Sequence, residues 1–222
     1  MLTTLEEKVD PRHAALLVID MQNDFCHEEG GRAKRGHDIK QVQEILPQLN
    51  RLIGEARGAG MPVFFIRGVH SEWTDSEVRR ERHQNKYPAA RSNCYEGSWG
   101  AELYGVTPEP GDQMITKNRY SAFINTNLDL ILRAQGIKSI ITTGTSTDAC
   151  VESTARDGFM MDYYIVFVDD CCGAATQEAH EGSLRAIRSH FGVVVRSEDV
   201  INALPREKVL TGMEAAAVLD TK

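Results

Sequence analysis

Short apolar runs alternate with longer amphipathic stretches along this chain. Six runs have the length and the β-branched or aromatic content of buried strands, and they cover residues 14–20, 61–67, 113–116, 139–144, 163–169 and 193–196. Apolar residues at helical spacing between them predict helices over residues 39–57, 127–135, 147–157 and 176–190, and a short one from residue 197. Strand–helix alternation throughout predicts an α/β fold, with a parallel sheet covered by helices on both faces.

Two segments interrupt this alternation. Residues 68–112 are polar and rich in Gly and Pro, which predicts a long excursion with short helical pieces; such excursions often form lids or binding loops. Residues 205–222 form a tail with a weak helical pattern at 213–219. A chain of 222 residues suits one domain, so we expect a single domain over residues 1–222.

Composition excludes several classes of protein. The formal net charge of −7 argues against nucleic-acid or membrane partners, and no apolar run is long enough to span a bilayer. The N-terminus has no apolar signal region, so we expect a cytoplasmic protein. An odd number of cysteines without a CxxC pair indicates neither a disulfide scaffold nor a zinc ribbon; the five are Cys26, Cys94, Cys150, Cys171 and Cys172. We also expect no cofactor.

Chemistry is expected where the strands end, because ligands of open α/β sheets bind beyond the carboxyl ends of the strands. Asp20, Arg67, Lys117 and residues 144–150 fall there. With Thr147 as the helix cap, Cys150 lies in a first helical turn, where exposed N–H groups favour a thiolate. From position alone, a nucleophile and a small buried thiol are equally good interpretations of Cys150.

Taken separately, neither Asp20 nor Lys117 indicates a catalytic role. A carboxylate at a strand end commonly caps a turn, and a lone lysine is commonly a surface charge. Together with Cys150 they are more informative, because a thiol nucleophile needs a base and a leaving amine needs an acid. One carboxylate can serve both purposes while the lysine orients it and stabilises the thiolate.

Several motifs resemble those of the isochorismatase-like cysteine hydrolases. They are LLVIDMQNDF (residues 16–25), SWGAELYGVTPEPGDQMITKNRYSAF (98–123), TTGTSTDACVESTARDGF (142–159) and VDDCCGA (168–174), so the resemblance spans about residues 12–204. It implies a six-stranded parallel sheet of order 3-2-1-4-5-6 and an Asp–Lys–Cys triad at Asp20, Lys117 and Cys150. It also implies a cis peptide at Thr145–Ser146 and an oxyanion hole from the N–H groups of Ser146 and Cys150.

The motifs also favour one branch of that family. Isochorismatases generally lack the cysteine, so Cys150 indicates amide hydrolysis. Nicotinamidases carry a metal site with an Asp-x-His pattern, of which only His70 is present here, so we expect no metal. GSW (97–99), RYSAF (119–123), CVEST (150–154) and DDCCGA look most like the ureide branch, with biuret, triuret or ureidoacrylate as substrate.

Other substrates and roles stay open. They are another small carboxamide (N-carbamoylsarcosine, maleamate or nicotinamide), vinyl-ether hydrolysis as in isochorismatases, and a non-catalytic member of the fold. Family members usually associate, so we expect a homo-oligomer, a dimer or a tetramer.

Position and resemblance also suggest the walls of a substrate pocket. The candidates are Asn23, Phe25, Arg67, Trp99, Tyr120, Phe123, Thr145 and His190. Core packing or a surface position is the alternative for each of them. No spacing suggests a metal for the remaining histidines, which we expect at the surface; they are His13, His27, His37, His83 and His180.

Overall fold

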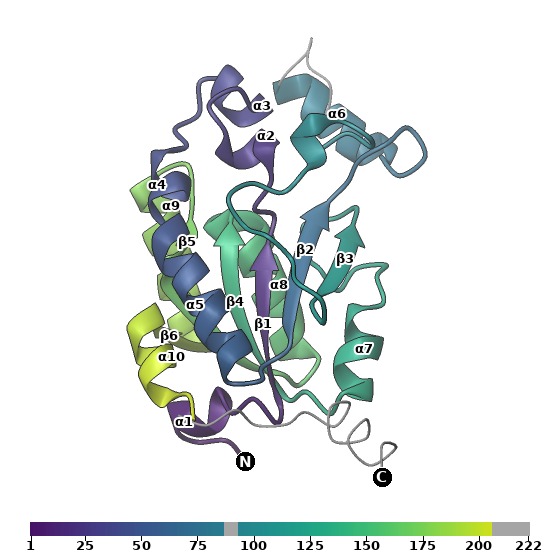
Figure 1. Ribbon diagram of the computed structural model, residues 1–222. Coiled ribbons are helices and arrows are strands. Elements are labelled where there is room, and N and C mark those ends of the chain that lie inside the picture. The colour runs from purple at the N-terminus through teal and green to yellow at the C-terminus, as the bar shows by residue number, and fades with distance from the viewer. Residues whose placement is uncertain (87–92, 206–222) are drawn as a thin grey trace.

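A computed structural model of the chain describes residues 1–86 and 93–205. Six parallel strands form one sheet in the order β3-β2-β1-β4-β5-β6, which confirms the expected topology (Figure 1). The strands are β1 (Ala14–Ile19), β2 (Val63–Gly68), β3 (Gln113–Lys117), β4 (Ser139–Thr145), β5 (Tyr164–Gly173) and β6 (Gly192–Val195). The helical pattern expected at 213–219 lies outside the described residues.

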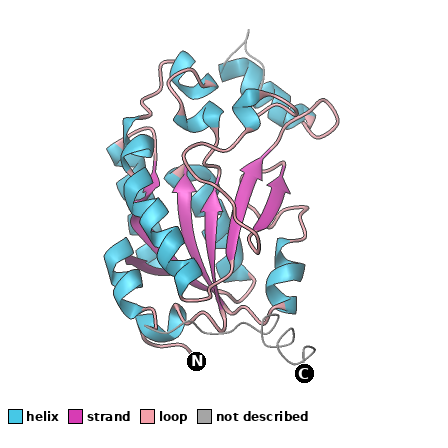
Figure 2. Cartoon of the chain, in the orientation of Figure 1, coloured by secondary structure: helices cyan, strands magenta, loops and turns pink. Residues whose placement is uncertain are grey.

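Helices cover both faces of this sheet, as Figure 2 shows. One layer holds α4 (Lys40–Glu44), α5 (Leu46–Gly58) and α10 (Ser197–Ala203), and the short α1 (Leu5–Lys8) contacts α10. The opposite layer holds α7 (Leu128–Ala134), α8 (Glu152–Met160) and α9 (Gln177–His190). Within the described residues, every helix is too short or too polar to cross a bilayer.

Strand β1 shows why its sequence is apolar at every position. Leu16 and Val18 pack into the core under α5, whereas Leu17 and Ile19 pack into the core under α7 and α8. Successive side chains of a strand point to opposite faces, so a central strand between two helical layers buries both sets. All six residues of β1 are buried accordingly.

Two expected elements differ from the structure. The helix expected over residues 39–57 is two helices, α4 and α5, which meet at Ile45. Pro47 lies at the start of α5; it has no N–H to donate and its ring disfavours a continuous helix, so the break falls there. Strand β5 runs on to Gly173, so Cys171 and Cys172 lie within a strand and are buried.

Short helices gather above the carboxyl ends of the central strands (Figure 1). They are α2 (Asn23–Cys26), α3 (Gly31–Lys34), α6 (Glu77–Lys86) and the 3-10 turn Trp99–Ala101. The last two belong to the polar excursion expected at 68–112. The helices therefore enclose the edge of the sheet at which the sequence places its reactive residues.

Candidate active site

A buried ion pair joins the ends of two strands. Asp20 follows β1, and Lys117 ends β3, with β2 between them. Lys117 Nζ donates to Asp20 Oδ2 at 2.7 Å and to the Arg119 carbonyl at 3.1 Å. The two side chains are only 1% and 2% exposed, so water screens their attraction little. Asp20 has a φ of 53°, a left-handed conformation that Asp tolerates better than most residues.

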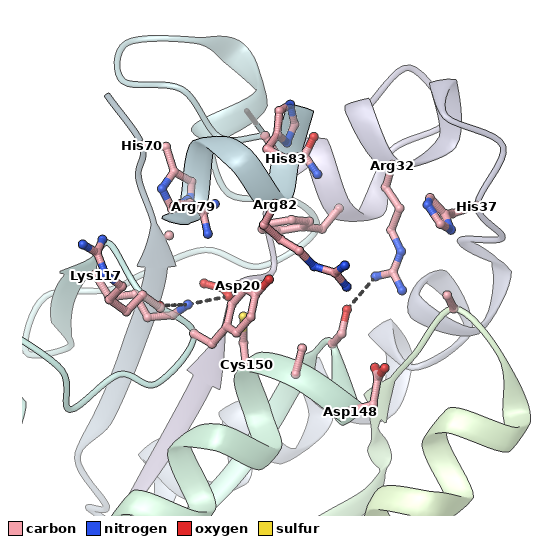
Figure 3. A pocket seen from close by; sticks show the side chains of 18 of the residues that line it. Asp20, Arg32, His37, His70, Arg79, Arg82, His83, Lys117, Asp148 and Cys150 are labelled. Atoms are coloured by element: carbon pink, nitrogen blue, oxygen red, sulfur yellow. Dashed lines mark hydrogen bonds and ion pairs between the residues drawn. The ribbon is translucent and has the colours of Figure 1, made fainter. Parts of the chain in front are cut away.

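The thiol of Cys150 lies beside this pair (Figure 3). Burial, and then the negative charge of Asp20, raise the pKa of Cys150 to about 12, while Lys117 acts in the opposite direction. Burial lowers the pKa of Lys117, but the charges of Asp20 and Cys150 more than offset this and raise it. The resting site therefore holds a neutral thiol beside a carboxylate–ammonium pair.

Only one of the two carboxylate oxygens of Asp20 has a hydrogen-bond partner in the described part of the chain. Asp20 Oδ2 accepts from Lys117, but Oδ1 is buried and has no hydrogen-bond partner among the described residues. A buried carboxylate oxygen without a hydrogen-bond partner is costly and calls for an explanation, of which a catalytic role is one. This oxygen is available to accept a proton.

The segment that carries Cys150 is not the capped α-helix expected from the sequence. Residues Thr147–Val151 form a π-helical turn, and α8 begins only at Glu152. Thr147 is not a helix cap, because its hydroxyl bonds to His180 Nδ1 at 3.0 Å. Single π turns occur frequently at functional sites, where they place a side chain that a regular helix would direct elsewhere.

Histidine 180 is a second correction in the same region. We expected it at the surface, but it is 4% exposed. From α9 it contacts both the π turn and β5. Its Nδ1 contacts Thr147, and its Nε2 contacts Asp169 Oδ1 at 2.8 Å. Ser183, one turn further along α9, donates to the Thr147 carbonyl at 3.4 Å. Sequence spacing gave no signal of this connection because its members lie on separate elements.

Ahead of the turn, the Thr145–Ser146 peptide is cis, as the resemblance implies. Arg32 of α3 donates from Nη1 to the Thr145 hydroxyl at 3.1 Å and to the Ser146 hydroxyl at 3.0 Å. Arg32 is 8% exposed, so α3 is fastened to the nucleophile loop by a buried guanidinium.

A cavity of about 530 Å³ opens above the thiol. Its volume suits a small ligand. Among the described residues, six lysines and arginines line it, against two carboxylates, Asp20 and Asp148; the six are Arg32, Arg35, Arg79, Arg82, Lys117 and Arg119. In a chain with a net charge of −7, this concentration of positive charge is local to the cavity.

The structure brings some of the sequence-predicted site residues together and separates the others. Asp20, Lys117, Cys150, Ser146, Phe25 and Tyr120 line the cavity. Asn23, Arg67, Trp99, Phe123, Thr145 and His190 do not. These six residues lie outside the lining of this cavity, and a role for them in substrate binding stays a prediction.

Each of the six has another position. Asn23 donates to the Trp99 carbonyl at 2.9 Å, and the Trp99 ring meets His27 edge-on. Arg67 donates to Thr116 across the β2–β3 ladder. Phe123 stacks on Tyr163 in the core.

The remaining two are Thr145, which is completely buried and donates to the Gly173 carbonyl, and His190, which is exposed at the end of α9. In a strand or helix a shift of one position changes the face, so sequence position alone could not tell lining residues from packing residues.

Beside the ion pair, His70 belongs to a buried cluster. Its Nδ1 contacts Asp75 Oδ1 at 3.0 Å, and Arg79 Nη2 contacts its Nε2 at 2.6 Å. Burial, followed by the charge of Arg79, lowers the pKa of His70 to about 4. Both ring nitrogens of His70 are thus occupied by protein groups. Within residues 1–86 and 93–205 no three His, Cys, Asp or Glu side chains are grouped as metal ligands.

Sequence reasoning missed the cationic wall of the cavity. Arg79, Arg82 and His83 project from α6 at spacings of three and four residues, and Arg35, directly after α3, lies three residues beyond Arg32. These spacings place each set on one helical face, which was the available signal. What the sequence could not supply was the direction in which these faces point.

Comparison with known proteins is consistent with this geometry. The family model described as the isochorismatase domain matches residues 14–199. The chain is 32% identical over 210 residues to ureidoacrylate amidohydrolase RutB of Enterobacter sp. (strain 638), covering 87% of this chain and 90% of that protein.

Two solved structures extend the comparison. A cysteine hydrolase from Pseudomonas syringae pv. phaseolicola 1448A has a TM-score of 0.77 at 26% identity, covering 87% of this chain and 93% of that one. N-carbamoylsarcosine amidase from Thermoplasma acidophilum has a TM-score of 0.68 at 28% identity, covering 84% and 97%.

Proposed function

The chain belongs to the isochorismatase family of hydrolases, and we propose that it is a cysteine-dependent amidohydrolase that cleaves a C–N bond of a small linear ureide or amide. The observation that carries this proposal is the buried Cys150 thiol beside a carboxylate with one unpaired oxygen. The names of two relatives, a ureidoacrylate amidohydrolase and an N-carbamoylsarcosine amidase, support C–N hydrolysis of this kind.

The first step follows from the pKa of the thiol. Because that pKa is raised to about 12, Cys150 is protonated at neutral pH and a base must take its proton as attack begins. Asp20 Oδ1 is the free acceptor, while Lys117 holds Oδ2 and fixes the carboxylate in place. The thiolate then attacks the carbonyl carbon of the substrate.

Later steps use the same groups. The oxyanion of the tetrahedral intermediate accepts hydrogen bonds from the N–H groups of Ser146 and Cys150. Asp20 returns the proton to the departing amine or ammonia, which leaves a thioester on Cys150. Water activated by Asp20 then hydrolyses the thioester. Lys117 keeps a positive charge next to Asp20 and Cys150 through every step.

Release of ammonia tests the proposal. The purified protein is incubated with biuret, triuret, ureidoacrylate, N-carbamoylsarcosine, maleamate and nicotinamide, with Cys150→Ala as the blank. We expect turnover of at least one ureide or amide, reduced by about a thousandfold or more in Cys150→Ala, as for loss of a covalent nucleophile.

Cys171→Ala is a matched control, because it removes a thiol buried on β5 away from the cavity. We expect it to retain turnover and to lose only the stability associated with a small core cavity. Full activity in Cys150→Ala would exclude Cys150 as the nucleophile. Release of pyruvate from isochorismate, without ammonia from any amide, would instead assign the site to vinyl-ether hydrolysis.

A further inference from the structure

We propose that the cavity selects amides and ureides that also carry a carboxylate, and that Arg82 of α6 is the residue that holds it. This inference rests on the proposed function, because it assumes that the scissile carbonyl lies at Cys150. Its starting point is the cluster of positively charged side chains that line the cavity, because a neutral substrate such as biuret would leave Arg82 of this cluster without a charged partner.

Most of the lining cations already have partners. Lys117 pairs with Asp20, and Arg79 pairs with Asp75 at 3.0 Å. Arg119 donates to the carbonyls of Thr74 and Asn118, at 3.0 and 2.8 Å. These groups are held in the wall by the protein itself, so they shape the cavity rather than reach for a ligand.

Arg32 of α3 and Arg35, directly after it, have partners as well. Arg32 donates to the hydroxyls of the nucleophile loop, and Arg35 donates to Asn93 Oδ1. Arg32 nevertheless contributes a positive charge next to Ser146, on the side of the cavity where the cis peptide lies. The charge of Arg32 therefore adds to the positive electrostatic potential of the cavity, although Arg32 itself does not bind the anion.

Arg82 differs from these residues. In the described part of the chain no side chain forms a hydrogen bond or ion pair with Arg82, yet Arg82 lines the cavity. Figure 3 shows its side chain extending from α6 toward the centre of the cavity, with the guanidinium near the space above Asp20 and Cys150. A planar guanidinium with an unoccupied fork matches a carboxylate in two parallel hydrogen bonds.

The charges at the two ends of the cavity, Asp20 beside Cys150 and Arg82 on α6, determine where the carboxylate of the substrate lies. Asp20 carries a negative charge beside Cys150, so a carboxylate is disfavoured at the thiol itself and favoured at the far side under α6. A cavity of about 530 Å³ has room for a ureide or amide with such an acid group attached. The substrate therefore lies with its carbonyl at Cys150 and its carboxylate at Arg82.

Binding to the Cys150→Ala protein tests this assignment without turnover. Calorimetry compares ureidoacrylate, maleamate and N-carbamoylglycine, each against the same compound with its carboxylate replaced by a primary amide. We expect at least one acid to bind about ten- to a hundredfold more tightly than its amide, the range for one charge-assisted pair. If no acid binds more tightly than its amide, the proposal is overturned.

Two variants in the same background locate the effect. Arg82→Gln is expected to remove most of the preference for the acid, whereas Arg188→Gln, an exposed arginine of α9 outside the cavity, is expected to leave it unchanged. Matching circular dichroism and thermal melting of the variants verify folding. A preference that survives Arg82→Gln would also overturn the role of Arg82.

Turnover by the wild-type chain separates this inference from the proposed function. Equal kcat/KM for an acid and its neutral amide would keep the amidohydrolase and remove the carboxylate selection. Tight binding of the acids without hydrolysis of any of them would remove the amidohydrolase and leave an anion-binding cavity.

Discussion

Asp20 acts on Cys150 in two opposing ways. Its charge raises the pKa of the thiol, which makes the thiolate rarer, while in the proposed mechanism its Oδ1 oxygen accepts the thiol proton. The two effects can be separated by substitution, because Asn keeps the shape of the side chain and removes both the charge and the basicity.

We therefore predict that Asp20→Asn lowers the pKa of Cys150 and yet abolishes turnover. Removal of the negative charge leaves Lys117 to stabilise the thiolate, so alkylation by iodoacetamide at neutral pH becomes faster than in the wild type. Turnover falls by about a hundredfold or more, because no base or acid remains. Slower alkylation in Asp20→Asn would contradict this account of the thiol.

His70 provides a prediction of stability against pH. The folded protein holds its pKa near 4, against 6.5 for the ordinary side chain, and the charged neighbours are Arg79, Asp75 and Lys117. The unfolded chain therefore binds more protons between those values. The free energy of unfolding therefore carries no penalty from His70 above about pH 6.5, and it falls as the pH is lowered from 6.5 toward 4.

The size of this effect is about 2 kcal/mol between pH 7 and pH 5. Denaturant unfolding at the two pH values measures it, with His70→Asn as the comparison because Asn does not titrate. We expect the variant to show a smaller loss on acidification than the wild type. Equal losses in both proteins would show that His70 does not titrate as described.

At the scale of elements, the π turn is held from behind by α9. Thr147 in the turn contacts His180, and His180 contacts Asp169 of β5. None of these three lines the cavity, so their influence on chemistry acts through the position of the turn. His180 is thus expected to be a positioning residue.

We predict that His180→Leu lowers kcat by about tenfold and leaves KM nearly unchanged, because a small displacement of a nucleophile costs rate more than binding. His180→Gln, which can still donate and accept, is expected to recover part of the loss. His190→Leu, at the exposed end of the same helix, is the matched control. A rise in KM with an unchanged kcat would place His180 in binding instead.

Gly144 controls the approach of β4 to β1 at the edge that carries the site. A Cβ on Gly144 would lie 2.0 Å from the Ile19 carbonyl, and its φ of 109° disfavours any other residue. We predict that Gly144→Ala costs more than about 3 kcal/mol of stability, measured by denaturant unfolding.

A helical glycine supplies the contrast. Gly54→Ala in α5 meets no atom within 4 Å and is expected to raise stability by about 0.5–1 kcal/mol, because alanine is the better helix former. If Gly144→Ala were as mild as Gly54→Ala, close packing of β4 on β1 would not be needed at this edge.

At the scale of the whole molecule, the net charge of the chain and the charge of the cavity would act in opposite directions on the anionic substrate proposed above. The chain carries a net charge of −7, whereas six lysines and arginines line the cavity in the part of the chain that the structure describes. Charges within about one screening length, roughly 10 Å at 0.1 M salt, dominate, so the cavity should prevail over the distant surface.

We predict that kcat/KM for maleamate falls several-fold as salt is raised from about 0.02 to 0.5 M, since screening weakens the attraction of the cavity. The value for its neutral amide is expected to change little, which controls for general effects of salt. An increase for maleamate would show that repulsion by the surface outweighs attraction by the cavity.

The resemblance of the motifs implied the order of the strands, and the positions of Asp20, Lys117 and Cys150 at strand ends predicted that these three residues meet. Buried strands of a doubly wound sheet are apolar throughout, and their carboxyl ends share one edge, so polar residues at those ends are expected to meet. Pro47 also carried a signal for the break between α4 and α5, although the apolar spacing alone favoured one helix.

Only the tertiary structure decided which side chains line the cavity and how Cys150 is presented. Arg67 and Phe123 face the sheet and the core, whereas Arg82 and Arg32 face the cavity, because orientation depends on how short helices after β1 and β2 pack over the sheet edge. The π turn and the contact of His180 with Thr147 likewise join segments far apart in sequence. Local periodicity fixes which face of an element is apolar, but the packing of separate elements fixes what its polar face meets.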